Sequence, residues 1–212
     1  ANIAATCEKI LQEVRNLQRS EIQEAGEGFD IEKQVGSSTM AHKKNPIKSE
    51  NASGLARIVR SMIIPTYENA LLWHERDLAN SSSERFTLSH GSALCEDVIA
   101  KTRDVLTNMW VDAERCLENI KSQRGLVMAE KVMIDLVEHG IPRDEAHEIL
   151  REASFAAVAN KEELIDVCSR TPAISAAFSA EELEAMFDPA NHIGVSGELV
   201  DECVALARDA IK

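Results

Sequence analysis

Three long stretches of this chain carry apolar residues at helical spacing, and this pattern limits the fold more than any other feature. In the first stretch, residues 1–25, apolar side chains recur at intervals of three and four residues: Ile3, Cys7, Ile10, Leu11, Val14 and Leu17. That spacing is typical of a helix with a coiled-coil-like seam. Gly26-Glu27-Gly28 is expected to end this helix. No capping residue precedes it at Ala1, as would be expected of a piece of a longer chain.

Two further long helices are predicted, from Pro46 to about His74 and from about Glu84 to Leu117. Pro65 should kink the first of them, because proline has no N–H to donate to the preceding turn. At 1.5 Å per residue, each helix would be about 40–50 Å long. Three such helices have more apolar surface than they can bury against one another. The pattern therefore favours a helix bundle that is shared between subunits.

The rest of the chain has shorter amphipathic patterns, which predict a second, smaller helical domain. Helix-breaking pairs and triplets separate these patterns at Gly140-Ile141-Pro142, Thr171-Pro172 and Asp188-Pro189. Ser179 to Glu182 has the spacing of a capping box, and a terminal helix is expected after Ser196. The predicted fold class is all-α, with a long-helix bundle over residues 1–120 and a small C-terminal helical domain over residues 121–212.

Cysteine content and hydropathy exclude several classes of protein. The five cysteines are widely spaced and form no CxxC pair, which argues for reduced thiols in a cytoplasmic protein and against a zinc site or a disulfide framework. No run of 18 apolar residues could span a bilayer. We therefore expect no metal, no cofactor and no membrane partner.

The formal net charge of −13 is unevenly distributed along the chain. Residues 31–60 carry six Lys or Arg against two Glu, whereas residues 111–212 carry ten basic against 21 acidic residues. A cationic site on an acidic body suits a small polyanionic substrate. It disfavours nucleic acid, which requires a broad basic face.

The cationic region centres on the loop Gly36 to Pro46, which is small, polar and set between two helical patterns. Asn45-Pro46 has the form of an N-cap followed by the first helical residue, so a helix start is expected to present free N–H groups to the loop. Together with Lys43 and Lys44 this would suit a carboxylate or phosphate. On composition alone, a solvated turn remains the alternative. The loop is not a Walker loop, because the second glycine and the Gly-Lys-Ser/Thr order are missing.

The letters of this loop, GSSTMAHKKNP, resemble the signature of the fumarase/aspartase superfamily, GSSxMPxKxNP. The continuation IKSENASGLARIVRS and the later WHERDLANSSSERF are similar to the adenylosuccinate lyase family in particular, and the resemblance covers the whole chain as the C-terminal half of a subunit. Ala41 departs from the signature by replacing proline. This should restore backbone freedom worth about 1 kcal/mol without removing a reactive group.

The resemblance implies a β-elimination that cleaves adenylosuccinate to AMP and fumarate, and likewise cleaves the succinyl-aminoimidazole-carboxamide ribotide of purine biosynthesis. It implies that Ser37 is the general base, that Lys43 binds the substrate carboxylate and neutralises the carbanion, and that Glu50 pairs with the lysine or a catalytic histidine. Further substrate contacts would come from Ser38, Asn45 and Asn51. Glu50 also has an ordinary structural interpretation, since acids are favourable at helix N-termini.

A second group, Arg76, Ser81 and Arg85, could bind a phosphate through guanidinium forks and a hydroxyl. By itself such a segment is more often a polar turn between helices. With the resemblance, these three residues are expected to contact the phosphate and ribose of a nucleotide substrate.

The family's general-acid histidine belongs to an upstream motif, and none of the six histidines of this chain occupies that place. The chain alone is therefore expected to be inactive. The resemblance also implies a cytoplasmic homotetramer whose active sites are shared between subunits. Two alternatives remain open: another lyase or cycloisomerase of the superfamily, and a catalytically silent helical assembly protein.

Overall fold

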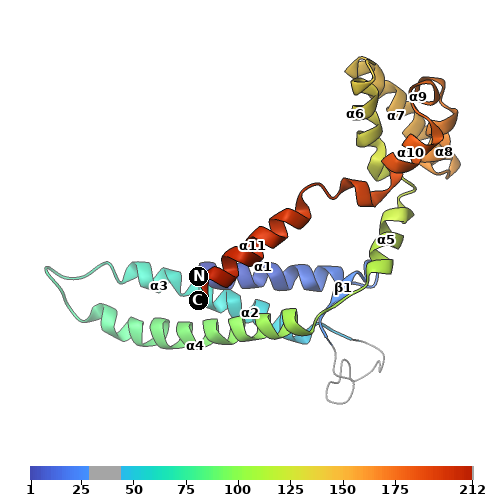
Figure 1. Cartoon of the computed structure of the whole chain (residues 1–212). Coiled ribbons are helices and arrows are strands. Elements are labelled where there is room, and N and C mark those ends of the chain that lie inside the picture. Colours follow the sequence, from blue (N-terminus) through green and yellow to red (C-terminus); the bar gives the residue numbers. More distant parts are fainter. Residues whose placement is uncertain (29–43, 212) are drawn as a thin grey trace. The chain divides into compact units, whose positions relative to one another are not determined.

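The computed structural model describes residues 1–28 and 44–211, and Figure 1 shows their arrangement. The chain divides into two compact units, Ala1–Cys116 and Leu117–Lys212. The elements of the first unit are α1 (Asn2–Leu17), β1 (Ala25–Gly26), α2 (Ile47–Ser61), α3 (Ile63–Glu68), α4 (Ala79–Asn108) and β2 (Trp110–Val111); α5 (Ala113–Ser122) crosses the boundary. The predicted all-α class is confirmed. The expected division into functional domains at residue 120 stays a prediction.

Helices α1, α2 and α4 pack against one another and enclose the core of the first unit. The core is built from mostly small residues: Ala4, Cys7, Leu11, Val14, Ala52, Ala56, Val59, Val98 and Val105. Ser49 and Ser53 are also buried on α2, and Ser53 donates its hydroxyl to the Ser49 carbonyl at 2.7 Å. Small side chains let the three helices approach closely.

Large apolar residues at helical spacing would be expected to form the buried face of α2, and this is only partly so. Val59 is buried, but Ile47 and Ile58 are 42% and 50% exposed. Large apolar residues dominate the helical pattern in the sequence, whereas the face of α2 that packs on α1 and α4 consists mostly of alanine and serine. These large residues consequently lie on a face that the described part of the chain leaves exposed.

Two predicted helix ends were also wrong, for a shared reason. Helix α1 ends at Leu17 rather than near residue 25, and α4 ends at Asn108 rather than Leu117. The chain leaves both helices to form a short antiparallel pair, in which Ala25 faces Val111 and Gly26 faces Trp110. A Cβ atom on Gly26 would lie 2.6 Å from the Trp110 ring, so only glycine fits there.

The predicted kink near Pro65 is present, but the break falls at Met62, between α2 and α3. Pro65 has no N–H to donate to the Ser61 carbonyl, so the series of backbone hydrogen bonds along the helix is interrupted at that point. Helix α3 ends at Glu68, short of His74, and α4 starts at Ala79, five residues before Glu84. Asp77 explains the early start, because its Oδ1 accepts the Ala79 N–H at 2.7 Å.

The second unit has its own core under short helices. Its elements are the 3-10 helix η1 (Leu126–Met128), α6 (Ala129–Glu138), α7 (Arg143–Asn160), α8 (Leu164–Arg170), α9 (Pro172–Ala177), α10 (Ala180–Phe187), η2 (Pro189–His192) and α11 (Ser196–Ala210). All three predicted breaks fall between helices, and the Ser179–Glu182 capping box is formed. Burial raises the pKa of the Cys168 thiol in this core to about 12, so that thiol is unreactive.

Helix α1 is tied to α2 by ion pairs from Glu8. Its carboxylate lies 3.2 Å from Arg57 Nε and also binds Arg60. Burial by itself would raise the pKa of Glu8, but the hydrogen bonds and charges of Arg60 and Arg57 outweigh it and lower the pKa. Because folding lowers this pKa, the ion pairs stabilise the fold above the pKa of the unfolded chain, and this contribution is lost as the pH falls through the folded-state pKa.

We predict that Glu8→Gln lowers stability at neutral pH by about 1 kcal/mol and has little effect once the pH lies below the folded-state pKa of Glu8. Thermal unfolding followed by tryptophan fluorescence at several pH values would measure this, because Trp73 and Trp110 both lie in the first unit. Glu13→Gln, an exposed position on the same helix, is the control. An effect of Glu8→Gln that does not change with pH would contradict the assignment.

Candidate active site

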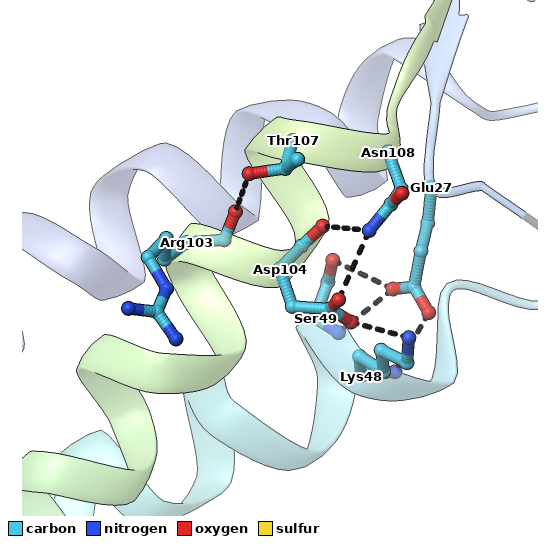
Figure 2. A network of polar contacts seen from close by, with 7 residues as sticks. All are labelled: Glu27, Lys48, Ser49, Arg103, Asp104, Thr107 and Asn108. Atoms are coloured by element: carbon cyan, nitrogen blue, oxygen red, sulfur yellow. Dashed lines mark hydrogen bonds and ion pairs between the residues drawn. The ribbon is translucent and has the colours of Figure 1, made fainter.

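The start of α2 is held by a carboxylate that comes from a distant part of the sequence. Glu27, which is 4% exposed, accepts the Lys48 N–H through Oε1 at 3.0 Å and the Ser49 N–H through Oε2 at 2.9 Å. The Ser49 hydroxyl donates to the same Oε2 at 2.9 Å (Figure 2). These donors belong to the first turn of the helix, where N–H groups have no partner within the helix and where the helix dipole favours negative charge.

This network corrects two predictions about the helix start. Asn45 is not the N-cap: α2 begins at Ile47, and Pro46 takes the N-cap position without a side-chain hydrogen bond of its own. The N–H groups of Lys48 and Ser49 are already bound to Glu27, so they are not free to bind a substrate anion. Sequence reasoning missed Glu27 because it treated Gly26-Glu27-Gly28 only as a helix stop. The sequence signal that could have indicated this role is an acidic residue between two glycines, outside any predicted helix face.

The same corner is tied to the end of α4. The Lys48 ammonium pairs with the Asp104 carboxylate. Asn108 donates its side-chain amide to Asp104 Oδ1 and to the Asp104 carbonyl, each at 2.9 Å (Figure 2). A Cβ atom on Gly28 would lie 2.3 Å from the Asn108 carbonyl oxygen, so the chain passes directly over the end of α4.

Gln18 joins the two sides of the same corner. Its Oε1 accepts the Glu27 N–H at 2.9 Å, and its Nε2 donates to the Lys44 carbonyl at 3.0 Å. Gln18 and Glu27 thus hold the described chain on both sides of residues 29–43. Ser37, Ser38 and Lys43, which the sequence singled out as base and substrate ligands, lie outside the described residues.

A cavity of about 950 Å³ opens beside the start of α2. Asn45 and Glu50 both line it, together with the last turn of α1 and Trp110. Glu50 is exposed in the first turn of α2, and no hydrogen bond or ion pair to its carboxylate is present among the described residues. Asn51 is exposed and does not line the cavity. Of the predicted residues described at this end of α2, Asn45 and Glu50 are therefore brought together.

Arg76, Ser81 and Arg85 lie around the start of α4. Asp77 shapes this segment: its carboxylate accepts the N–H groups of Ala79 and Trp73, which lowers the pKa of Asp77. Arg76 and Arg85 are exposed and Ser81 is half-buried. Ser81 and Arg85 are one helical turn apart, so they lie on the same face of α4.

The two groups of predicted residues are not brought together within this chain. Helices α2 and α4 run antiparallel, since Lys48 pairs with Asp104 and Met62 lies against Gly91. The 19 residues from Arg85 to Asp104 span about 28 Å of helix. In a single copy, the two groups of predicted residues therefore lie at opposite ends of the α2–α4 pair.

Three of the described histidines contact other side chains or the backbone of this chain. His74 stacks on Trp73, the His139 ring meets Phe178 edge-on, and a ring nitrogen of His192 is hydrogen-bonded to the Met186 carbonyl. No histidine in the described part of the chain lines the cavity beside Glu50. Within residues 1–28 and 44–211 there is also no group of three potential metal ligands, and no helix long and apolar enough to cross a membrane.

Comparison with known proteins gives two family matches. Residues 1–61 match a family model described as lyase, and residues 125–203 match one described as adenylosuccinate lyase C-terminus. The crystal structure of 3-carboxy-cis,cis-muconate lactonizing enzyme from Pseudomonas putida has a TM-score of 0.84 at 30% identity, covering 96% of this chain and 44% of that one. Fumarate lyase from Mesorhizobium sp. BNC1 has a TM-score of 0.82 at 26% identity, covering 94% and 43%. In sequence and in fold, the chain is therefore similar to a class of helical lyases.

Within that class, the chain is similar to adenylosuccinate lyases. The enzyme of Archaeoglobus fulgidus is 42% identical over 212 residues, which is 100% of this chain and 48% of the relative. The enzyme of Methanothermobacter thermautotrophicus is 43% identical over 95% of this chain and 45% of the relative, and that of Streptococcus mutans 34% over 95% and 46%. The chain spans about half the length of the curated relatives it matches.

We predict that Glu27→Ala lowers the stability of the first unit by about 2 kcal/mol, because it leaves the Lys48 and Ser49 donors without an acceptor. Glu27→Gln keeps an acceptor oxygen and should lose less. Urea unfolding followed by tryptophan fluorescence would measure both, with the exposed Glu21→Ala as the control. Equal stability of the Glu27→Ala and Glu21→Ala variants would refute the capping role.

Proposed function

We propose that this chain contributes to a carbon–nitrogen lyase that eliminates fumarate from adenylosuccinate, giving AMP, and from the succinyl-aminoimidazole-carboxamide ribotide. The similarity to adenylosuccinate lyases over the full length of the chain is the observation that carries the proposal. The cavity that contains Asn45 and Glu50 is consistent with it, since both residue types have predicted roles in this chemistry.

The reaction removes a weakly acidic proton next to a carboxylate, so negative charge accumulates on that carboxylate before the amine leaves. Fixed donors that stabilise this charge lower the barrier. In the proposed mechanism Ser37 takes the proton. Lys43 and Asn45 stabilise the charged carboxylate, with Ser38 and Asn51 as further substrate contacts. A serine hydroxyl is a weak base unless its alkoxide is stabilised, and the Lys43 charge would serve that purpose as well.

Glu50 would act on a partner rather than on the substrate. Its carboxylate has no hydrogen-bond partner among the described residues, although it lines the cavity. An acid in that position can orient and charge a histidine or lysine that approaches it. We propose that the general-acid histidine reaches Glu50 from a part of the enzyme that this chain does not supply.

We further propose that the enzyme is a cytoplasmic homotetramer with shared active sites. The half-site at Asn45 and Glu50 and the half-site at Arg76, Ser81 and Arg85 are about 28 Å apart along α4. A substrate molecule cannot bridge that distance. Pairing the first half-site of one copy with the second half-site of another would bring both to one substrate.

The alternative function is that of a cycloisomerase, favoured by the structural likeness to the muconate lactonizing enzyme. The two functions differ in the phosphate of the substrate. A nucleotide lyase uses Arg76 and Arg85 to bind it, and an enzyme acting on a muconate does not need them for that purpose.

The mechanism can be tested by fusing this chain to the part of the Archaeoglobus fulgidus enzyme that it does not match. We predict that the chimera releases fumarate from adenylosuccinate and that the 212-residue chain alone does not. Ser37→Ala in the chimera should lower kcat by about a thousandfold or more with little change in substrate Kd, because the hydroxyl acts in the transition state. Lys43→Ala should impair both. A Ser37→Ala chimera with near-normal kcat would exclude Ser37 as the base.

The substrate class can be tested with the same chimera by calorimetry. We predict that Arg85→Gln weakens AMP binding about tenfold or more and adenosine binding much less, since a charged hydrogen bond to phosphate is lost. Arg103→Gln, which removes an exposed arginine from the same helix, is the control. Equal losses for AMP and adenosine would favour the cycloisomerase.

A further inference from the structure

Two arginines at the end of α1 line the same cavity as Asn45 and Glu50, and no role was assigned to them from the sequence. Arg15 lies in the last turn of α1, and Arg19 lies just after the helix ends. They are four residues apart. Arg15 is half-buried and Arg19 is exposed.

In the part of the chain that the structure describes, neither guanidinium pairs with an acid. Arg15 Nη1 donates to the Gln12 side-chain oxygen at 2.8 Å, and Arg19 Nε donates to the Asn16 carbonyl at 3.3 Å. Each thus uses one N–H on an uncharged acceptor, and no ion pair joins either of them to a carboxylate among the described residues. The chain has 36 acidic against 23 basic residues, so acids are not scarce.

Within the described residues, the two acids that line the cavity form no ion pair with either arginine. Glu50 forms no ion pair with them, and Asp112 accepts the Arg115 N–H at 2.9 Å, as a cap at the start of α5. One cation at the end of α1 is explained by the helix dipole, which favours positive charge there. The dipole does not explain two guanidiniums a turn apart, whose mutual repulsion is unfavourable without an anion.

We propose that Arg15 and Arg19 form an anion subsite in this cavity, which binds a small doubly charged oxyanion, either a dicarboxylate or a phosphate. Guanidinium forks match the oxygen pairs of both groups. The subsite deepens the proposed function, because the eliminated product is a dicarboxylate and the other product carries a phosphate. Asn45 and Glu50 line the same cavity.

The test uses the whole 212-residue chain and two probes, succinate and inorganic phosphate. In a Trp73→Phe background, Trp110 is the remaining tryptophan, and it lines the cavity. Its fluorescence should change on titration with at least one probe, and calorimetry should give the same Kd. Preference for succinate assigns the subsite to the dicarboxylate, and preference for phosphate assigns it to the nucleotide phosphate.

Arg15→Gln with Arg19→Gln should raise that Kd about tenfold or more, since two charged hydrogen-bond donors are lost. Arg143→Gln with Arg208→Gln removes the same charge from the second unit and is the matched control. Arg15→Lys with Arg19→Lys keeps the positive charges but not the paired N–H donors of the guanidinium groups. This variant should bind with intermediate affinity. If the double glutamine variant is unfolded by circular dichroism, Arg19→Gln alone, at an exposed position, must still weaken binding.

Absence of binding by either probe, or equal weakening in the Arg143/Arg208 control, would overturn the subsite. Because the readout is binding to the chain and not catalysis, this outcome is independent of the proposed function. An inactive chimera with an intact arginine-dependent Kd would refute the lyase proposal and leave the subsite standing.

Discussion

The hydrogen bonds from the first turn of α2 to Glu27 are the interaction on which the candidate site depends. A carboxylate that is only 4% exposed loses most of its hydration, and hydrogen-bond donors must offset that cost. The Lys48 and Ser49 N–H groups and the Ser49 hydroxyl supply three donors, and the positive end of the helix dipole faces the same oxygens. Since Gln18 also binds the Glu27 N–H and the Lys44 carbonyl, the chain on both sides of residues 29–43 is fixed against one corner of the helix bundle. The wall of the cavity formed by Asn45 and Glu50 is fixed by the same contacts.

The packing of α2 has a second consequence for the whole unit. Its buried face is made mostly of alanine and serine, which brings α1 and α4 close, whereas the large side chains of Ile47 and Ile58 are exposed. Ile58 on α2 and Ile99 and Leu106 on α4 stay 44–50% exposed. Exposed apolar side chains along long helices are the feature expected of a bundle completed by further helices. Small residues on the inner face therefore give close packing, and large residues on the outer face leave apolar surface exposed. Both features agree with the proposed assembly of several copies.

The parts of this structure that could be predicted from sequence are those that depend on local contacts. Helical spacing identified the three long helices, and the Ser179 capping box and the breaks before Pro142, Pro172 and Pro189 were correct because each acts over a few residues. The ends of α1 and α4 were missed because Ala25–Gly26 pairs with Trp110–Val111, some 85 residues away in the sequence. The capping of α2 by Glu27 was missed for the same reason, across 21 residues. The signature and its continuation singled out Asn45 and Glu50, which both line the cavity. No local pattern indicates that Arg85 lies about 28 Å along α4 from Asp104, the residue that pairs with the start of α2.

The surroundings of Arg76 and Arg85 explain how such a separated half-site could acquire affinity. In the isolated chain both guanidiniums are exposed, and a single exposed charge pair contributes little because water and salt screen it. Large apolar side chains flank them: Leu71, Trp73, Leu78 and Phe86 are each at least 66% exposed. If another copy of the chain covers these side chains, as the proposed tetramer requires, water is excluded from the neighbouring guanidiniums and the effective dielectric constant falls. Coulombic attraction for a phosphate then increases several-fold without any change in the residues that contact it. In that arrangement the assembly that unites the two half-sites also strengthens the second one, so binding of the nucleotide and association of the subunits would be coupled.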